Sequence, residues 1–122
     1  MKKISLIIVS LFSVLAFSFS ANAIKVGALY LDTAGFFGEI KVGIEAAGAE
    51  EGIELTGANS QSDVAKESEF IDTLIAKGVD VVVMSPVSTD SSVAAVERLA
   101  EAGIPVVCYN TCLNDDDASR LA

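Results

Sequence analysis

The sequence contains no histidine and no tryptophan, and it is poor in basic residues. Without histidine, the chain lacks the side chain that most often acts as a general base or as a zinc ligand. Acidic residues number 17 against eight basic ones, which gives a net charge of −9. Nucleic acids and anionic membranes need clustered lysine and arginine, so we expect neither as a partner.

Phosphate-binding and catalytic motifs are also missing. The first predicted strand ends in LDTAGFFG, where a dinucleotide-binding turn would need G-x-G-x-x-G before the helix. The chain contains no P-loop and no nucleophile elbow. We therefore predict a protein that is not an enzyme and that uses no cofactor.

The amino terminus has the pattern of an export signal. Lys2 and Lys3 precede a nearly continuous apolar run over residues 4–19, and an Ala-Asn-Ala triplet then supplies the small residues of a cleavage site. The run is short for a membrane-spanning helix, and no basic segment follows it. We predict that residues 1–23 are a signal peptide cleaved after Ala23, and that the mature protein resides in the periplasm.

Three glycines mark a repeated pattern of helix followed by strand. Gly52, Gly78 and Gly103 each follow an amphipathic segment and precede an apolar one, at spacings of 26 and 25 residues. Glycine tolerates the left-handed conformation that turns a helix sharply into a strand. The predicted strands are 24–31, 53–59, 79–85 and 105–109; the predicted helices are 37–51, 64–77 and 91–102, with Asp63 and Ser88 or Thr89 as N-caps.

This alternation of strands and helices predicts an α/β fold. Parallel strands joined by right-handed crossover helices give a doubly wound sheet, for which we predict the order 2-1-3-4. Only 13 residues follow Tyr109, so the fourth strand would be left as an exposed edge. We therefore interpret residues 24–122 as an incomplete domain, the amino-terminal piece of a longer protein.

Aromatic and polar residues gather where the predicted strands end, which is where open parallel sheets bind ligands. Phe36 and Phe37 follow the first strand. Because adjacent residues at a helix start point about 100° apart, we expect at least one of them to face a ligand rather than the core. Ser85 ends the third strand. Asn110 follows the fourth and suits a neutral hydroxylated ligand, with a turn role as the alternative.

Cys108 and Cys112 could form a disulfide in an oxidising compartment. Four fully extended residues span roughly 13–14 Å, whereas bridged Cα atoms lie within about 7 Å. A disulfide would thus require a sharp turn at Asn110 and Thr111. We favour Cys108 as a small apolar residue of the strand and keep the disulfide as the alternative. We predict no metal site, because histidine and a second cysteine pair are absent.

Four features occur in a characteristic order: the export signal, IKVGALYLDTAGFFGEIKVGIEAA, LIAKGVDVVVMSPVSTDS and AGIPVV. This order resembles the amino-terminal lobe of the periplasmic sugar-binding proteins of ABC importers, the ribose/galactose-binding type with a LacI-like fold, over nearly all of residues 24–120. The resemblance implies that Phe36 and Phe37 stack on a sugar ring. It also implies that Ser85, Asn110 and Thr111 contact the ligand.

The sequence departs from that family pattern at two places. Ala34 and Gly35 stand where sugar binders often carry Asn-Pro before the aromatic pair. Asn110 and Thr111 stand where several members carry Asp-Arg. Because the charged pair is missing, we expect a ligand other than ordinary ribose: a different sugar, a polyol or another small polar molecule.

The resemblance implies a non-enzymatic solute receptor that captures a sugar or polyol and presents it to the membrane permease of an ABC importer. One alternative is a receptor that hands its ligand to a chemoreceptor or a sensor kinase. The other is a secreted flavodoxin-like α/β enzyme. Proteins of the resembled family close two lobes around the ligand, and this chain would supply one of them.

Overall fold

A computed structural model describes residues 22–114. The predicted signal peptide, except for its last two residues, lies outside this range, and so do residues 115–122. Within residues 22–114, no helix has the length and apolar character needed to cross a membrane.

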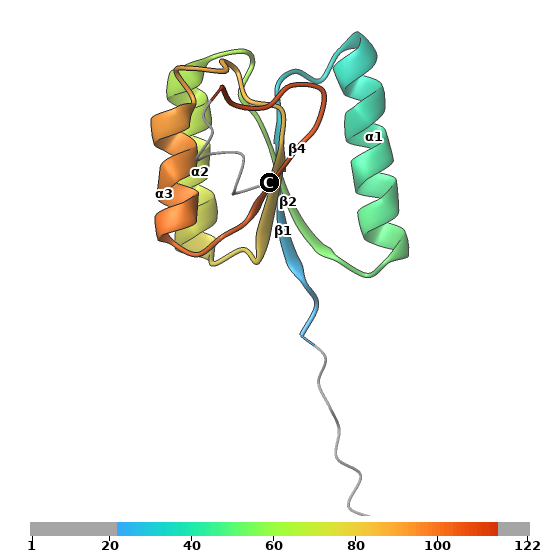
Figure 1. The fold of residues 1–122 in the computed structure, drawn as a ribbon. Helices are drawn as coiled ribbons and strands as arrows, with labels where there is room; N and C mark the ends of the chain where they lie inside the picture. Colours follow the sequence, from blue (N-terminus) through green and yellow to red (C-terminus); the bar gives the residue numbers. More distant parts are fainter. Residues whose placement is uncertain (1–21, 115–122) are drawn as a thin grey trace, which may run out of the picture.

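Four strands and three helices alternate along the chain (Figure 1). The helix predicted over residues 64–77 is found with those bounds, the second strand ends at residue 59 as predicted, and the other predicted ends shift by one or two residues. In chain order the elements are β1 (Lys25–Tyr30), α1 (Gly35–Glu50), β2 (Glu54–Asn59), α2 (Val64–Lys77), β3 (Val81–Met84), α3 (Val93–Glu101) and β4 (Val106–Cys108).

The strands form one parallel sheet in the order β2-β1-β3-β4, which confirms the predicted fold class and strand order. The chain moves from β1 to β2 in one direction and then from β2 through β3 to β4 in the other. Right-handed crossovers therefore place α1 on one face of the sheet and α2 and α3 on the other, as Figure 1 shows.

The main core lies between the sheet and the pair α2 and α3. Strand side chains that point to this face are fully covered, among them Leu29, Val82 and Met84. Leu74 of α2 and Leu99 of α3 pack against them. The two helices are also joined at their surface, where the Arg98 guanidinium bonds the Asp72 carboxylate at 2.9 Å.

Helix ends follow the predicted turn chemistry with one exception. Gly52, Gly78 and Gly103 all adopt positive φ, between 62° and 72°, the conformation that favours glycine. Asp63 caps α2 by accepting from two backbone N–H groups. The exception is α3, where the predicted cap is wrong: Ser92 precedes the helix, and Ser88 instead closes a preceding turn by accepting from the N–H groups of residues 90 and 91.

Candidate ligand-binding site

Strand register brings the ends of β1, β3 and β4 to one edge of the sheet, called here the carboxyl edge (residues 31–37, 85–92 and 109–114). Leu29 pairs with Met84, and Met84 pairs with Cys108. Just beyond this register, the Tyr109 N–H donates to the Met84 carbonyl at 2.9 Å. The segments that carry the predicted ligand residues therefore leave the sheet together.

The aromatic pair stands at the start of α1. Phe36 is 63% exposed and Phe37 is half-buried. Their rings meet edge to face, with centroids 5.3 Å apart and an interplanar angle of 73°. The close turn before them requires glycine at position 38, since a Cβ there would lie 2.8 Å from the Thr33 carbonyl oxygen. The Phe37 ring is therefore partly covered, whereas the Phe36 ring is open to solvent at the carboxyl edge.

Ser85 lies at the end of β3 and is fully buried. Its hydroxyl has no hydrogen-bond partner within the described part of the chain. A ligand could reach this hydroxyl only if neighbouring residues moved. The role predicted for Ser85 in ligand contact therefore stays a prediction.

Asn110 and Thr111 lie inside a short ring closed by a disulfide between Cys108 and Cys112, whose Cα atoms are 5.3 Å apart. Our preference for an unbonded Cys108 is therefore wrong in this structure. The reason is the sharp turn: Asn110 adopts φ 63°, and the Thr111 N–H donates to the Tyr109 carbonyl at 2.7 Å. Asparagine is among the residues that tolerate this left-handed conformation.

The side chains of this ring are accessible. Asn110 and Thr111 are both exposed, and the Asn110 amide donates to the Thr111 hydroxyl at 3.1 Å. The pair carries hydrogen-bond donors and acceptors but no charge. Such a pair suits hydroxyl groups better than ionised groups.

Tyr109 is a residue of the carboxyl edge that sequence reasoning assigned only to a strand end. Its hydroxyl donates to the Leu29 carbonyl at 3.3 Å, so the side chain reaches from β4 past β3 to β1. Burial raises the pKa of this phenol, while the backbone of Leu31 acts in the opposite direction. In the sequence, the only sign of this role is that an aromatic residue directly precedes Asn110 and Thr111. The strand order is needed to show that its hydroxyl reaches Leu29 of β1.

Asn114 ties two segments of the carboxyl edge to each other. Its N–H donates to the Thr89 carbonyl at 3.0 Å, and its side-chain amide reaches the Thr89 hydroxyl and the Asp90 carboxylate, each at 3.3 Å. The segment that follows β4 is therefore fastened to the loop between β3 and α3. Thr89 and Asp90 serve structure here, in line with the turn-forming role of such residues.

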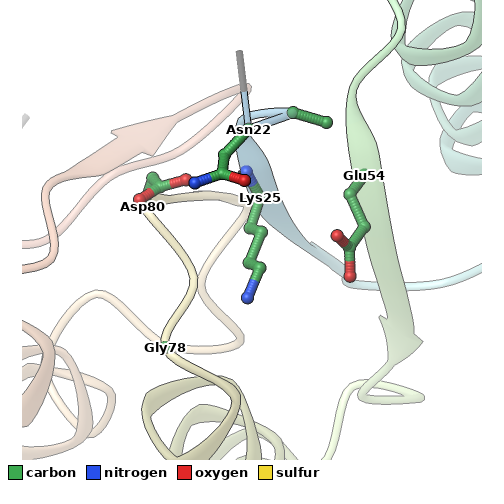
Figure 2. A pocket seen from close by; sticks show the side chains of 6 residues that line it. Asn22, Lys25, Glu54, Gly78 and Asp80 are labelled. Carbon is green, nitrogen blue, oxygen red and sulfur yellow. The ribbon is translucent and has the colours of Figure 1, made fainter. Parts of the chain in front are cut away.

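Two polar cavities lie elsewhere in the described region. A cavity of about 330 Å³ is at the opposite end of the sheet, between the charged side chains of Lys25, Glu54 and Asp80 (Figure 2). The backbone N–H of Lys25 donates to the Asp80 carboxylate there at 2.8 Å. This end holds the amino ends of the strands, whereas ligands of open parallel sheets bind at the carboxyl ends.

The second cavity, of about 190 Å³, lies between α1 and the ends of β1 and β2. The ion pair of Lys41 and Glu45, 2.6 Å long, lines it together with Tyr30. Burial, followed by the nearby Glu45 carboxylate, raises the pKa of Tyr30 to about 12. Within residues 22–114, no cluster of three or more histidine, cysteine, aspartate or glutamate residues could hold a metal ion.

An open doubly wound sheet with exposed aromatic and amide groups at its carboxyl edge defines one lobe of a ligand-binding α/β protein. The chain belongs to the periplasmic binding protein domain family, which matches residues 27–122. This is a family of solute-binding proteins and not a family of enzymes. Its members that serve ABC importers are periplasmic.

Two curated relatives illustrate the similarity. The chain is 42% identical over 97 residues to the ABC transporter periplasmic-binding protein YphF of Escherichia coli (strain K12), a match that covers 78% of this chain and 30% of the relative. It is 30% identical over 93 residues to a xylitol-binding protein of Mycolicibacterium smegmatis, covering 76% of this chain and 27% of that protein. The chain thus spans less than a third of the length of these two relatives.

Solved structures agree with this assignment. The periplasmic binding protein of the arabinose ABC transporter from Shewanella sp. ANA-3, bound to α- and β-L-arabinofuranose, superposes with a TM-score of 0.72 at 25% identity, covering 78% of this chain and 32% of that one. A Mycobacterium smegmatis protein in complex with β-D-fucofuranose gives a TM-score of 0.73 at 27% identity, with the same two coverages.

Proposed function

We propose that this chain is the amino-terminal lobe of a periplasmic receptor that captures a sugar or polyol for an ABC importer. The observation that carries the proposal is the presence, at one edge of the sheet, of an exposed aromatic ring and of two exposed uncharged polar residues, Asn110 and Thr111. Similar proteins bind xylitol and furanose sugars, which supports the same class of ligand here.

Each group at the carboxyl edge has a distinct part in capture. The exposed ring of Phe36 offers a flat apolar surface to the C–H face of a sugar or polyol, and Phe37 supports it edge-on. Asn110 and Thr111 bond ligand hydroxyls, and Ser85 joins them if the loop after β3 opens. A second lobe then closes over the ligand and, with this one, meets the importer's permease. The site carries out no catalysis.

Export places the receptor in the periplasm, and we infer that residues 1–23 are removed after Ala23. Amino-terminal sequencing of the protein recovered from a periplasmic fraction tests this directly. The expected first residue is Ile24. A sequence that still starts at Met1 would contradict the inference.

A ligand screen tests the function. The full-length gene product is titrated with xylitol, arabinose, ribose and myo-inositol, while its melting temperature and its heat of binding are recorded. The true ligand stabilises the folded protein by about 2.7 kcal/mol at a concentration of 100 times its Kd, so a clear rise in Tm is expected. If no sugar or polyol raises Tm or releases heat, the proposal fails.

Variants then connect binding to the carboxyl edge. Phe36→Ala removes the exposed ring and is expected to raise Kd by roughly tenfold, because about 1.4 kcal/mol of apolar contact is lost. Val42→Ala is the matched control, since Val42 lies on the same helix and is 61% exposed. Its Kd should equal that of the unmodified protein. Equal effects of the two substitutions would contradict a stacking role for Phe36.

The disulfide ring offers a second connection. Thr111→Val and Asn110→Ala each remove a hydrogen bond to the ligand and are expected to raise Kd about tenfold. Reducing the Cys108–Cys112 bond frees the same two residues from the ring that holds them, so it should weaken binding as well. If reduction leaves Kd unchanged, the ring does not hold the pair in its binding conformation.

A further inference from the structure

A buried carboxylate lies behind the candidate ligand-binding site. Glu67 belongs to α2, and none of its surface is exposed. Its Oε2 atom accepts a hydrogen bond from the Val87 N–H at 2.7 Å. Its Oε1 atom has no hydrogen-bond partner among the described residues. Glu67 therefore holds one backbone group of the loop between β3 and α3, from 20 positions earlier in the chain.

Packing alone does not explain a glutamate at this position. Removing a carboxylate from water is costly unless the group is paired and hydrogen-bonded. The ion pairs of the described residues join Lys41 to Glu45 and Arg98 to Asp72, and neither includes Glu67. An apolar side chain of the same volume would avoid the cost of burial. The contact with Val87 is the feature that distinguishes glutamate from such a residue.

The loop that receives this bond is part of the carboxyl edge. Val87 lies two residues after Ser85, whose hydroxyl is also buried without a described partner. It directly precedes Ser88, where the turn before α3 begins. Within that turn, Thr89 and Asp90 accept hydrogen bonds from Asn114, which links the loop to the segment that carries Asn110 and Thr111. The hydrogen bond from Glu67 thus fixes the loop between β3 and α3 at Val87. Through Asn114, this loop in turn supports the segment that follows β4.

We propose that Glu67 is a positioning residue for ligand binding. Its carboxylate fixes the Val87 backbone, and with it residues 85–88, in the conformation that completes the carboxyl edge, without itself touching the ligand. This inference rests on the proposed function, because it assigns Glu67 to the same site. It predicts that the affinity for the ligand depends on a side-chain oxygen at position 67 that can accept from the Val87 N–H, and depends little on the negative charge of that side chain.

Three substitutions separate these properties. Glu67→Gln keeps an acceptor oxygen at the same reach. Glu67→Met keeps the volume but removes the acceptor. Glu67→Asp keeps the charge but draws the carboxylate back by one methylene. Glu69→Met is the matched control, because Glu69 lies on the same helix and is exposed.

The test uses the full-length gene product and two measurements. The first is hydrogen exchange of the Val87 amide without ligand, and the second is Kd for whichever sugar or polyol the unmodified protein binds in the screen. We expect Glu67→Met and Glu67→Asp to speed exchange and to raise Kd about tenfold. We expect Glu67→Gln and Glu69→Met to stay within about threefold of the unmodified protein in both measurements.

The outcomes distinguish this inference from the proposed function. If the unmodified protein binds a ligand but Glu67→Met and Glu67→Asp bind it equally well, the positioning role is overturned and the receptor function stands. If Glu67→Gln loses as much affinity as Glu67→Asp, an uncharged acceptor at the same reach is not sufficient, and the inference is again overturned. An unmodified protein that binds no sugar or polyol overturns the proposed function, and the ligand role of Glu67 with it. If Glu67→Met does not fold, the comparison of Glu67→Asp with Glu67→Gln decides.

Discussion

The two faces of the sheet are built from similar residues but are packed very differently. Val106 and Val107 are neighbours in β4, yet Val106 is 2% exposed and Val107 is 49% exposed. Val106 points toward α2 and α3, which together cover their face of the sheet. Val107 lines the groove between α1 and the sheet, on the face that α1 covers alone (Figure 1). The comparison shows that two side chains of the same type in one strand are buried or exposed according to the elements that lie over them.

An apolar groove marks the less covered face. It has a volume of about 310 Å³ and runs between α1 and the sheet, bounded by Ile44 on the helix and by Val81, Val83 and Val107 on the strands. The opposite face has a continuous core instead. Since the free energy gained by burial scales with the apolar area removed from water, we expect the α2 and α3 face to supply most of the stability of the described region.

The largest expected effect is that of removing a core side chain. Leu99→Ala on α3 deletes a fully buried side chain and should lower the free energy of unfolding by about 2–5 kcal/mol. Ile44→Ala on α1 removes a half-buried side chain beside the groove and should cost about 1 kcal/mol. Urea unfolding monitored by circular dichroism gives both values. Equal losses would show that the two faces contribute equally.

Alkaline pH tests a buried tyrosine of the α1 face. Tyr30 is 2% exposed, and its pKa of about 12 exceeds the ordinary value of 10.0. As pH rises, the Tyr30 phenol therefore ionises in the unfolded chain before it ionises in the folded protein. The folded protein keeps its full stability below pH 10 and loses stability as pH rises toward 12. The loss should reach about 2–3 kcal/mol near pH 12.

Tyr30→Phe supplies the control for this alkaline loss. The difference in Tm between the two proteins should change steadily above pH 10, because phenylalanine cannot ionise. Tyr109, whose pKa is also raised, is present in both proteins and cancels in the comparison. Parallel Tm curves over this range would show that Tyr30 ionises as easily in the folded protein as in the unfolded chain.

The two adjacent valines of β4 allow the same substitution on each face. Val106→Ala should lower the free energy of unfolding by about 2 kcal/mol, because two methyl groups are lost from a filled core. Val107→Ala should change it by less than about 0.5 kcal/mol. Both variants are measured by thermal and urea unfolding. A cost for Val107→Ala as large as that for Val106→Ala would mean that something covers Val107 in solution.

Two glycines, one facing each side of the sheet, allow the packing of the two faces to be compared by adding a methyl group instead of removing one. A Cβ at Gly27 would lie 2.7 Å from a methyl carbon of Leu74 in the main core, so Gly27→Ala should cost about 1 kcal/mol. A Cβ at Gly57 would lie 3.0 Å from the Tyr30 ring. That ring borders a cavity and can shift, so Gly57→Ala should cost less than Gly27→Ala. The opposite order would show that the α1 face is the more rigid one.

Much of the fold could be predicted because its signals are local. Glycines at 52, 78 and 103 mark helix ends through their backbone conformation, and all three adopt the positive φ that the pattern implies. Apolar spacing predicted all four strands and all three helices. The helix over residues 64–77 has clear signals at both ends, Asp63 and Gly78, and its bounds were predicted correctly.

The site was less predictable because its details depend on contacts between distant residues. The Cys108–Cys112 bond required a left-handed Asn110, which spacing alone does not reveal. Glu67 occupies a position that reads as one more charged residue of an amphipathic helix, and only the packing of α2 against the loop after β3 shows it to be buried. The ligand roles of Phe36, Phe37, Ser85, Asn110 and Thr111 stay predictions.

The sequence by itself determined the order of strands and helices, the parallel sheet and the edge at which the predicted ligand residues gather, since these follow from periodicity, turn residues and the handedness of crossovers. Tertiary structure alone decided which face of the sheet holds the core, that Val107 is exposed while Val106 is not, and that a carboxylate from α2 bonds the backbone of the loop after β3. The physical reason is that burial and hydrogen bonding depend on which elements meet in space, and residues 20 or more positions apart meet only when the chain is folded.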